Sequence, residues 1–242
     1  MNRFSIAIRQ QEGNLLYEKM IRIARFRDRR EAGQLLAKKL SKYVNCRELL
    51  VLALPRGGVP VGFEVAKALK APLDIFVVRK LGVPGEEELA MGAIAPGGIR
   101  VLDEEIIRLM EISDHVIETV SAKEREELRR REVAYRGHAH PLHVSGKTVI
   151  LVDDGIATGS TMRAAIVALR KQYLSKLIVA VPTASPSTCD ELRTIADEVV
   201  AVITPEPFVA VGRWYAIFDQ TSDVEVRQLY RQSRRWQREA AA

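Results

Sequence analysis

Two adjacent carboxylates and a short turn rich in hydroxyl groups are the residues of this chain best suited to chemistry. Asp153 and Asp154 directly follow the apolar run Thr148–Val152, and the turn Ala157–Thr161, with Gly159 at its centre, comes soon after them. Its hydroxyl residues are Thr158, Ser160 and Thr161. A helical pattern begins at the end of the turn, so free N–H groups and the positive end of the helix dipole would attract an anion. The spacing therefore predicts a phosphate site at this turn.

The acidic pair cannot hold the same phosphate, because like charges repel. At the end of a strand and just before the turn, Asp153 and Asp154 are better placed to accept hydrogen bonds from sugar hydroxyls. Ribose 5-phosphate fits this division. A simple helix cap would explain one acid but not the pair together with the turn. A phosphohydrolase with a metal on the pair is a weaker alternative, because no histidine or further acid lies at metal-ligand spacing.

Cationic and glycine residues follow two other apolar runs. The segment Arg56–Gly58 comes after Leu49–Leu54, and Lys80 comes after Asp74–Val78. Ligands bind at the carboxyl ends of the strands in open α/β sheets, so these residues are expected near the phosphate turn. Arg56 would offer a fork of N–H donors to an anion. A sharp glycine turn and a solvated lysine are the structural alternatives.

The strand, acid pair and Thr-Gly turn at residues 148–161 resemble the phosphoribosyl pyrophosphate signature of the type I phosphoribosyltransferases. From Phe26 to about Leu229 the chain is also similar to a group of stand-alone bacterial phosphoribosyltransferase-like proteins, so the resemblance covers most of the chain. The further segments that carry it are Phe26–Arg29, Leu54–Pro60, Val78–Gly82 and Thr204–Phe208.

This resemblance implies a reaction in which an acceptor displaces pyrophosphate from C1 of phosphoribosyl pyrophosphate. Asp153 and Asp154 are then expected to hold the ribose hydroxyls and to favour the cationic carbon that forms as pyrophosphate leaves. The turn Ala157–Thr161 would bind the 5-phosphate. The expected pyrophosphate contacts are Arg56, Gly57, Gly58 and Lys80. The implied cofactor is Mg²⁺, which the substrate would bring to the site. Asp153 and Asp154 are the candidate protein ligands of this ion.

The acceptor, a nitrogenous base or an amine, is not identified by the sequence. Many purine enzymes of the family carry an Asp immediately before the Thr-Gly of the loop, but here the position is Ala157, which cannot accept a proton. Either the acceptor loses its proton easily or another residue serves. Phe208 could stack on an acceptor, although packing onto the core would explain it equally well. The main alternative is a non-catalytic protein that binds a nucleotide or phosphoribosyl pyrophosphate and regulates another process.

The elements that must position these residues alternate between short apolar runs and segments of helical period, which is typical of βα units around a parallel sheet. The expected strands are Leu49–Leu54, Asp74–Val78, Thr148–Val152, Leu177–Val181 and Val199–Ile203. The expected helices are Arg30–Lys42, Val61–Leu69, Thr161–Gln172 and Pro186–Ala196, with Ser185 as N-cap of the last. We therefore expect an α/β fold of three layers with a parallel sheet, an inserted lid and a small hood.

One domain, residues 26–230, accounts for most of the chain. Within it, residues 83–146 interrupt the alternation and are expected to cover the active site as a lid, and residues 204–230 would form part of the hood. The insertion shows a hairpin pattern at residues 91–94 and 99–102 and a charged helix near 121–135. The basic segments 1–25 and 231–242 are predicted to be an N-terminal extension and a tail with solvated helical faces.

The composition is that of a globular protein. The 242 residues are 47% hydrophobic and 28% charged, with a net charge of +6. Cys46 and Cys189 lie far apart and suggest neither a disulfide framework nor a zinc site. The loop histidines His138, His140 and His143 favour exposure to solvent over a transition-metal site. The sequence has no membrane-length apolar run and no signal-peptide pattern, so we expect a cytoplasmic protein that does not bind membranes. We also expect a homo-oligomer that binds small molecules and not nucleic acid.

Overall fold

A five-stranded parallel sheet forms the centre of the computed structural model, which describes residues 25–137 and 142–241. The strands lie in the order β2-β1-β6-β7-β8, and every neighbouring pair is parallel. They are β2 (Leu73–Ile75), β1 (Leu49–Ala53), β6 (Thr148–Val152), β7 (Lys176–Thr183) and β8 (Glu198–Ile203). Because parallel strands end at one edge, the segments after these strands gather there. The predicted parallel α/β sheet is confirmed.

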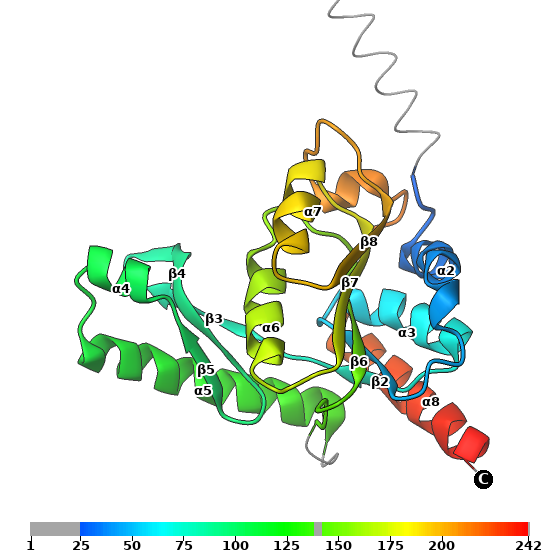
Figure 1. Ribbon diagram of the computed structural model, residues 1–242, viewed down its shortest axis with the longest axis horizontal. Coiled ribbons are helices and arrows are strands. Elements are labelled where there is room, and N and C mark those ends of the chain that lie inside the picture. The colour runs from blue at the N-terminus through cyan, green and yellow to red at the C-terminus, as the bar shows by residue number, and fades with distance from the viewer. Residues whose placement is uncertain (1–24, 138–141, 242) are drawn as a thin grey trace, which may run out of the picture.

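Helices cover both faces of this sheet (Figure 1). On one side lie α6 (Ser160–Arg170) and α7 (Pro186–Arg193). On the other lie α2 (Arg29–Lys39), α3 (Gly58–Leu69) and α8 (Asp223–Ala241). The short 3-10 helix η1 (Ser41–Tyr43) follows α2. Ser185 caps α7 as predicted, because its side chain accepts a hydrogen bond from the N–H of Thr188 at 3.1 Å. The arrangement has the three predicted layers.

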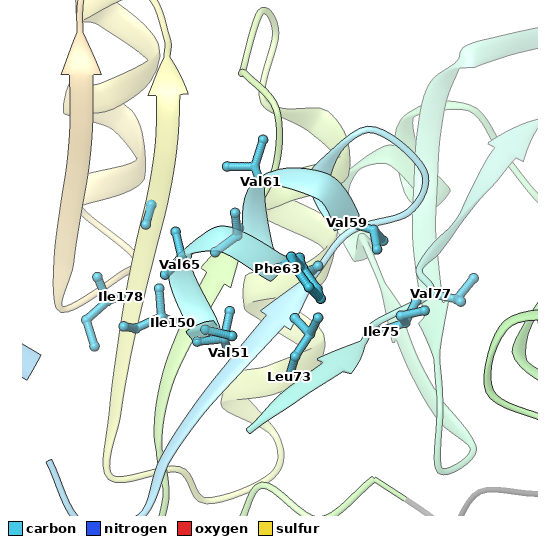
Figure 2. Packing of buried hydrophobic residues seen from close by; sticks show 14 of the residues in the cluster. Val51, Val59, Val61, Phe63, Val65, Leu73, Ile75, Val77, Ile150 and Ile178 are labelled. Atoms are coloured by element: carbon cyan, nitrogen blue, oxygen red, sulfur yellow. The ribbon is translucent and has the colours of Figure 1, made fainter. Parts of the chain in front are cut away.

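Buried side chains of the sheet and of α3 form a large part of the core (Figure 2). Val51 of β1, Ile150 of β6 and Ile178 of β7 share one buried cluster with Phe63 and Val65 of α3. A second cluster lies on the α6 side of the sheet. The central strand β6 is buried from Val149 to Val152, as expected for a strand covered on both faces. A strand fixed in this way determines where the residues after it lie.

An inserted unit follows β2 and carries a second, antiparallel sheet of order β3-β4-β5. Its elements are β3 (Arg79–Val83), β4 (Glu86–Ala95), β5 (Ile99–Leu102), α4 (Glu104–Leu109) and α5 (Asp114–Arg136). The predicted hairpin is confirmed, and the structure adds a third strand. Leu81, Met91 and Ile94 are buried in the cluster that they share with α3, so the base of the unit is packed onto the domain although its far end projects from it (Figure 1).

The predicted strand at residues 74–78 is wrong in its extent. β2 ends at Ile75, and the chain then crosses to the inserted sheet, where β3 begins at Arg79. Phe76 and Val77 on this crossing are both buried. Because buried positions require apolar residues whether or not they pair in a sheet, composition does not distinguish this segment from a strand. Lys80 is therefore the second residue of β3 and does not close a strand of the main sheet.

The segment after β8 returns to the start of α2. It contains the 3-10 helix η2 (Val211–Trp214), and Tyr215 forms a β-bridge with Phe26. The predicted boundary at residue 231 falls within α8, in which Val226, Tyr230 and Ser233 are buried. Residues 1–24, nearly all of the predicted N-terminal extension, lie outside the described residues. Within the described ranges, no helix is long and apolar enough to cross a membrane.

Candidate functional site

The predicted phosphate turn joins β6 to α6 and is fixed to its surroundings. The N–H of Ile156 donates to the carbonyl of Thr183 at the end of β7, at 2.9 Å. Thr188 Oγ1 donates to the carbonyl of Ala157 at 2.8 Å. Gly159 has φ +74°, the left-handed conformation that glycine adopts most readily, and α6 begins at the next residue. The turn is thus held at the N-terminus of a helix.

A hollow of about 130 Å³ lies at this turn. Its lining residues are Asp153, Gly155, Ile156, Ala157, Thr158, Gly159, Ser160, Thr161 and Met162. The start of α6 adds free N–H groups and a partial positive charge, which together favour an anion. The structure therefore brings all the predicted turn residues to one hollow and places one of the two acids at its side.

Asp153 and Asp154 lie directly after β6, at the carboxyl edge of the sheet. The N–H of Asp154 donates to Oδ1 of Asp153 at 2.8 Å. Burial raises the pKa of Asp153 well above its ordinary value, and the charge of Asp154 raises it further. Burial also raises the pKa of Asp154, against the opposing effect of the Arg29 guanidinium. Buried carboxylates of this kind gain from nearby hydroxyl donors or a cation.

Arg29, at the start of α2, is the ionic partner of Asp154, and the sequence assigned it no role. Its Nε lies 2.8 Å from Oδ2 of Asp154, and the two side chains are only 13% and 15% exposed. On the other side of the pair, the hydroxyl of Tyr215 donates to the main-chain carbonyl of Asp154 at 2.5 Å. The ion pair joins residues 125 positions apart, so no local sequence pattern could have revealed it.

The loop after β1 packs directly against the acidic pair. A Cβ at Gly57 would lie 1.9 Å from Oδ2 of Asp154, and one at Gly58 would lie 2.7 Å from the carbonyl oxygen of Val152. Only glycine leaves room for these approaches. The Pro55–Arg56 peptide bond is cis, and Nη1 of Arg56 lies 3.7 Å from Oδ1 of Asp223 at the start of α8. The predicted pyrophosphate loop and the predicted ribose acids are thus in contact.

A cavity of about 570 Å³ adjoins both this loop and the phosphate turn. Its wall includes Pro55 from the loop, Thr161 from the turn, and Lys80 from β3. The remaining lining residues are Val78, Arg79, Gly82, Pro84, Glu87, Val120, Lys123, Glu124 and Arg131. Arg79 is neutralised by Glu124, 2.6 Å away. Lys80 therefore reaches the neighbourhood that the sequence predicted for it, but by way of the inserted sheet.

The predicted acceptor residue Phe208 is half-buried in the loop between β8 and η2. The hood meets the acid-bearing turn through Val211, whose Cγ1 would lie 2.4 Å from a Cβ at Gly155. Trp214 and Tyr215 are buried, as expected for aromatic residues that pack this segment onto the core. Ala157 is exposed, and its methyl group can accept no proton. The sequence did not single out the contact made by Val211.

Protein side chains alone do not form a metal centre in the part of the chain that the structure describes. It contains no group of three or more His, Cys, Asp or Glu side chains that could hold a metal ion. His143 is exposed, whereas His138 and His140 lie outside the described residues. The oxygens of Asp153 and Asp154 are nevertheless of the hard type that Mg²⁺ prefers. The pair therefore fits an ion whose other ligands come from a substrate.

Several known proteins are similar to most of this chain. The phosphoribosyl transferase domain model matches residues 27–213. Two Mycobacterium tuberculosis proteins, each named provisionally as a phosphoribosyl transferase, are 45% identical over 201 residues, which are 83% of this chain and 45% of theirs. The chain thus spans about half the length of these curated relatives. The crystal structure of TT1426 from Thermus thermophilus is 42% identical with a TM-score of 0.77, and the match covers 85% of this chain and 97% of that one. The chain belongs to the phosphoribosyl transferase domain family.

Proposed function

We propose that this protein is a phosphoribosyltransferase, which moves ribose 5-phosphate from phosphoribosyl pyrophosphate to a nitrogenous acceptor and releases pyrophosphate. The observation that carries the proposal is the contact of the glycine loop after β1 with the acidic pair beside the phosphate turn. Gly57 lies against Asp154, while Asp153 lines the hollow of the turn. A sugar between two phosphate-bearing ends requires such an arrangement.

The donor is proposed to lie across these three parts. Its 5-phosphate occupies the hollow at Ala157–Thr161, where the start of α6 supplies N–H donors. Its ribose hydroxyls donate to Asp153 and Asp154. Its diphosphate lies at the loop Arg56–Gly58 and extends toward Lys80 in the adjoining cavity. Each charged part of the donor then meets a group of opposite charge or a hydrogen-bonding partner.

Transfer breaks the bond between C1 of the ribose and the diphosphate oxygen, and a nitrogen of the acceptor forms the new bond to C1. As the diphosphate leaves with the electron pair of the broken bond, C1 becomes cationic, as in glycoside cleavage. The carboxylates of Asp153 and Asp154 stabilise this developing charge. Arg56 and Lys80 stabilise the negative charge on the departing diphosphate.

Asp153 and Asp154 would be the protein groups that hold Mg²⁺ at this site, together with oxygens of the donor. When bound, the ion would neutralise charge on the leaving diphosphate. Asp223, a further acid near this edge, already has two side-chain partners. It accepts a hydrogen bond from the Tyr135 hydroxyl at 2.9 Å and lies near Arg56.

The acceptor is proposed to be a base or an amine that enters beneath the segment from Phe208 to Val211. With Ala157 at the loop position, the proton of the acceptor nitrogen cannot pass to that residue. An acceptor that loses its proton easily, or a base elsewhere in the hood, is required. The comparisons give no support to the non-catalytic regulatory alternative, which becomes an outcome of the experiment below.

The test is a screen of bases and amines for acceptor-dependent release of pyrophosphate from phosphoribosyl pyrophosphate with Mg²⁺. The double variant Asp153→Asn/Asp154→Asn should abolish release. The exposed Asp190 of α7, which pairs with Arg193, gives a matched control, since Asp190→Asn removes one carboxylate that does not belong to the acidic pair. Turnover retained in the double variant would overturn the roles of the two acids. Tight binding of phosphoribosyl pyrophosphate without turnover on any acceptor would favour the regulatory alternative.

A further inference from the structure

Arg29 makes three contacts that connect Asp154 of the acidic pair with the hood segment at Phe218 and Asp219. Its Nε donates to Oδ2 of Asp154 at 2.8 Å. Its Nη1 donates to the main-chain carbonyl of Asp219 at 2.7 Å, and its guanidinium lies 3.9 Å from the centre of the Phe218 ring. The guanidinium thus makes hydrogen bonds in its plane and a cation–π contact on its face, and together these contacts fix its position.

The residues around Arg29 are themselves fixed. The Phe218 ring packs on Tyr215 with centroids 4.8 Å apart, and Tyr215 packs on Phe26 with centroids 5.3 Å apart. The main chain of the two segments is also joined, because the N–H of Ala216 donates to the carbonyl of Phe26 at 2.8 Å. The segment before α2 and the segment after η2 therefore form one packed body around the guanidinium.

This body holds Asp154 at two points. Arg29 binds the side chain, and the Tyr215 hydroxyl binds the main-chain carbonyl at 2.5 Å. Arg29 binds Oδ2, and the backbone of Gly57 packs against the same oxygen. Rotation of the carboxylate would break the ion pair and press on the glycine loop.

We propose that Arg29 is a positioning residue for the transfer reaction: it holds the Asp154 carboxylate in the orientation that receives the ribose hydroxyls, and it transmits the position of the Phe218–Asp219 segment to that carboxylate. The inference rests on the proposed function, since it takes phosphoribosyl pyrophosphate as the ligand. In this role Arg29 acts through Asp154 and not on the reacting carbon.

The experiment measures the dissociation constant of phosphoribosyl pyrophosphate with Mg²⁺, which requires no acceptor. Arg29→Gln should weaken binding by about 10- to 100-fold, which is the range found when a residue that orients a metal ligand is mutated. Arg29→Lys keeps the charge but not the fork and should recover part of the affinity. Arg27→Gln is the matched control, because Arg27 is 64% exposed and pairs only with its neighbour Asp28 among the ion pairs of the described chain. It should bind as the wild type does.

A double-mutant cycle separates positioning from a general effect on folding. In the Asp154→Asn background, Arg29→Gln should cause little further loss of affinity, because the carboxylate that it positions is gone. Equal losses in both backgrounds would overturn the proposal. Should Arg29→Gln fail to fold, Phe218→Leu removes the ring beneath the guanidinium and leaves the ion pair. It should weaken binding in the wild type but not beside Asp154→Asn.

The outcomes distinguish this inference from the proposed function. Wild-type protein that does not bind phosphoribosyl pyrophosphate would contradict the proposed function and, with it, the role of Arg29. Wild-type binding that is unchanged in Arg29→Gln would contradict the role of Arg29 alone. If turnover is found, Arg29→Gln should raise the KM for phosphoribosyl pyrophosphate and Arg29→Lys should lower it again, and an unchanged KM with normal stability would also overturn the inference.

Discussion

Gly57→Ala adds a single methyl group at the contact between the glycine loop and the acidic pair. The new Cβ would lie 1.9 Å from Oδ2 and 2.5 Å from Cγ of Asp154. Since Cβ atoms essentially never approach another heavy atom within 3.0 Å, the carboxylate or the loop must move by about 1 Å. The carboxylate cannot turn aside freely, because its Oδ2 is 2.8 Å from Nε of Arg29.

Gly57→Ala should impair function as well as stability. Gly57 has φ −61° and ψ −32°, a helical conformation that alanine adopts without strain, so only the crowding matters. Overpacking of this kind costs about 1–3 kcal/mol of folding free energy. A displacement of about 1 Å in a positioned group can lower turnover about 10²-fold. We expect a loss of that order in the affinity for phosphoribosyl pyrophosphate or in kcat/KM.

The assay compares binding of phosphoribosyl pyrophosphate with unfolding in urea for two variants. Gly92→Ala in β4 is the matched control, because its Cβ would lie 2.3 Å from the carbonyl oxygen of Val101, away from the acidic pair. It should lose stability and keep its affinity. Gly57→Ala should lose affinity. Affinity in Gly57→Ala within about threefold of the wild type, less than about 1 kcal/mol, would refute the idea that this contact forms part of the donor site.

Three further predictions concern the turn, the acids and the cavity. Gly159→Ala, at φ +74° and with Thr188 Cγ2 3.0 Å from the new Cβ, should cost about 1–2 kcal/mol in urea unfolding and weaken phosphoribosyl pyrophosphate binding; an unchanged affinity would contradict the phosphate site. Because burial raises the pKa of Asp153, the folded protein holds this proton to higher pH than the unfolded chain does, so its contribution to stability is lost as pH rises above about 4. Asp153→Asn should therefore gain stability relative to the wild type as the pH rises above about 4.5 in urea unfolding, and a constant difference would be inconsistent with the raised pKa. Lys80→Ala should weaken the binding of pyrophosphate about tenfold, whereas Lys147→Ala, just before β6 and paired with Glu48 at 2.7 Å, should not; equal affinities measured by calorimetry would exclude Lys80 as a contact.

The sequence was most informative where a function depends on neighbours along the chain. The strand Thr148–Val152, the acids after it and the turn into α6 are one continuous segment, so its strand was predicted with the bounds that the structure gives. The same holds for Ser185 and Pro186 at the start of α7, because a cap and its helix are local. Local patterns of polarity and glycine suffice for such features.

Features that depend on distant residues could not be predicted in this way. Arg29 belongs to a run of basic residues, and only the folded chain shows that it meets Asp154 and Phe218. The glycines of the loop after β1 are typical of a sharp turn. Only the folded structure shows that position 57 has no room for a side chain, because Asp154, which follows β6, packs against it. The crossing Phe76–Val78 resembles a strand because the core requires apolar residues whether or not they pair.

The measurement that tests the central claim most directly is the mass of the acceptor after incubation with the protein, phosphoribosyl pyrophosphate and Mg²⁺. Transfer adds ribose 5-phosphate to the acceptor, whereas simple breakdown of the donor by water releases pyrophosphate and leaves the acceptor unchanged. We predict a ribosylated acceptor with the wild type and with Asp190→Asn, and none with Asp153→Asn/Asp154→Asn. A ribosylated product formed equally well by the double variant, or pyrophosphate release with no change in any acceptor, would contradict the account.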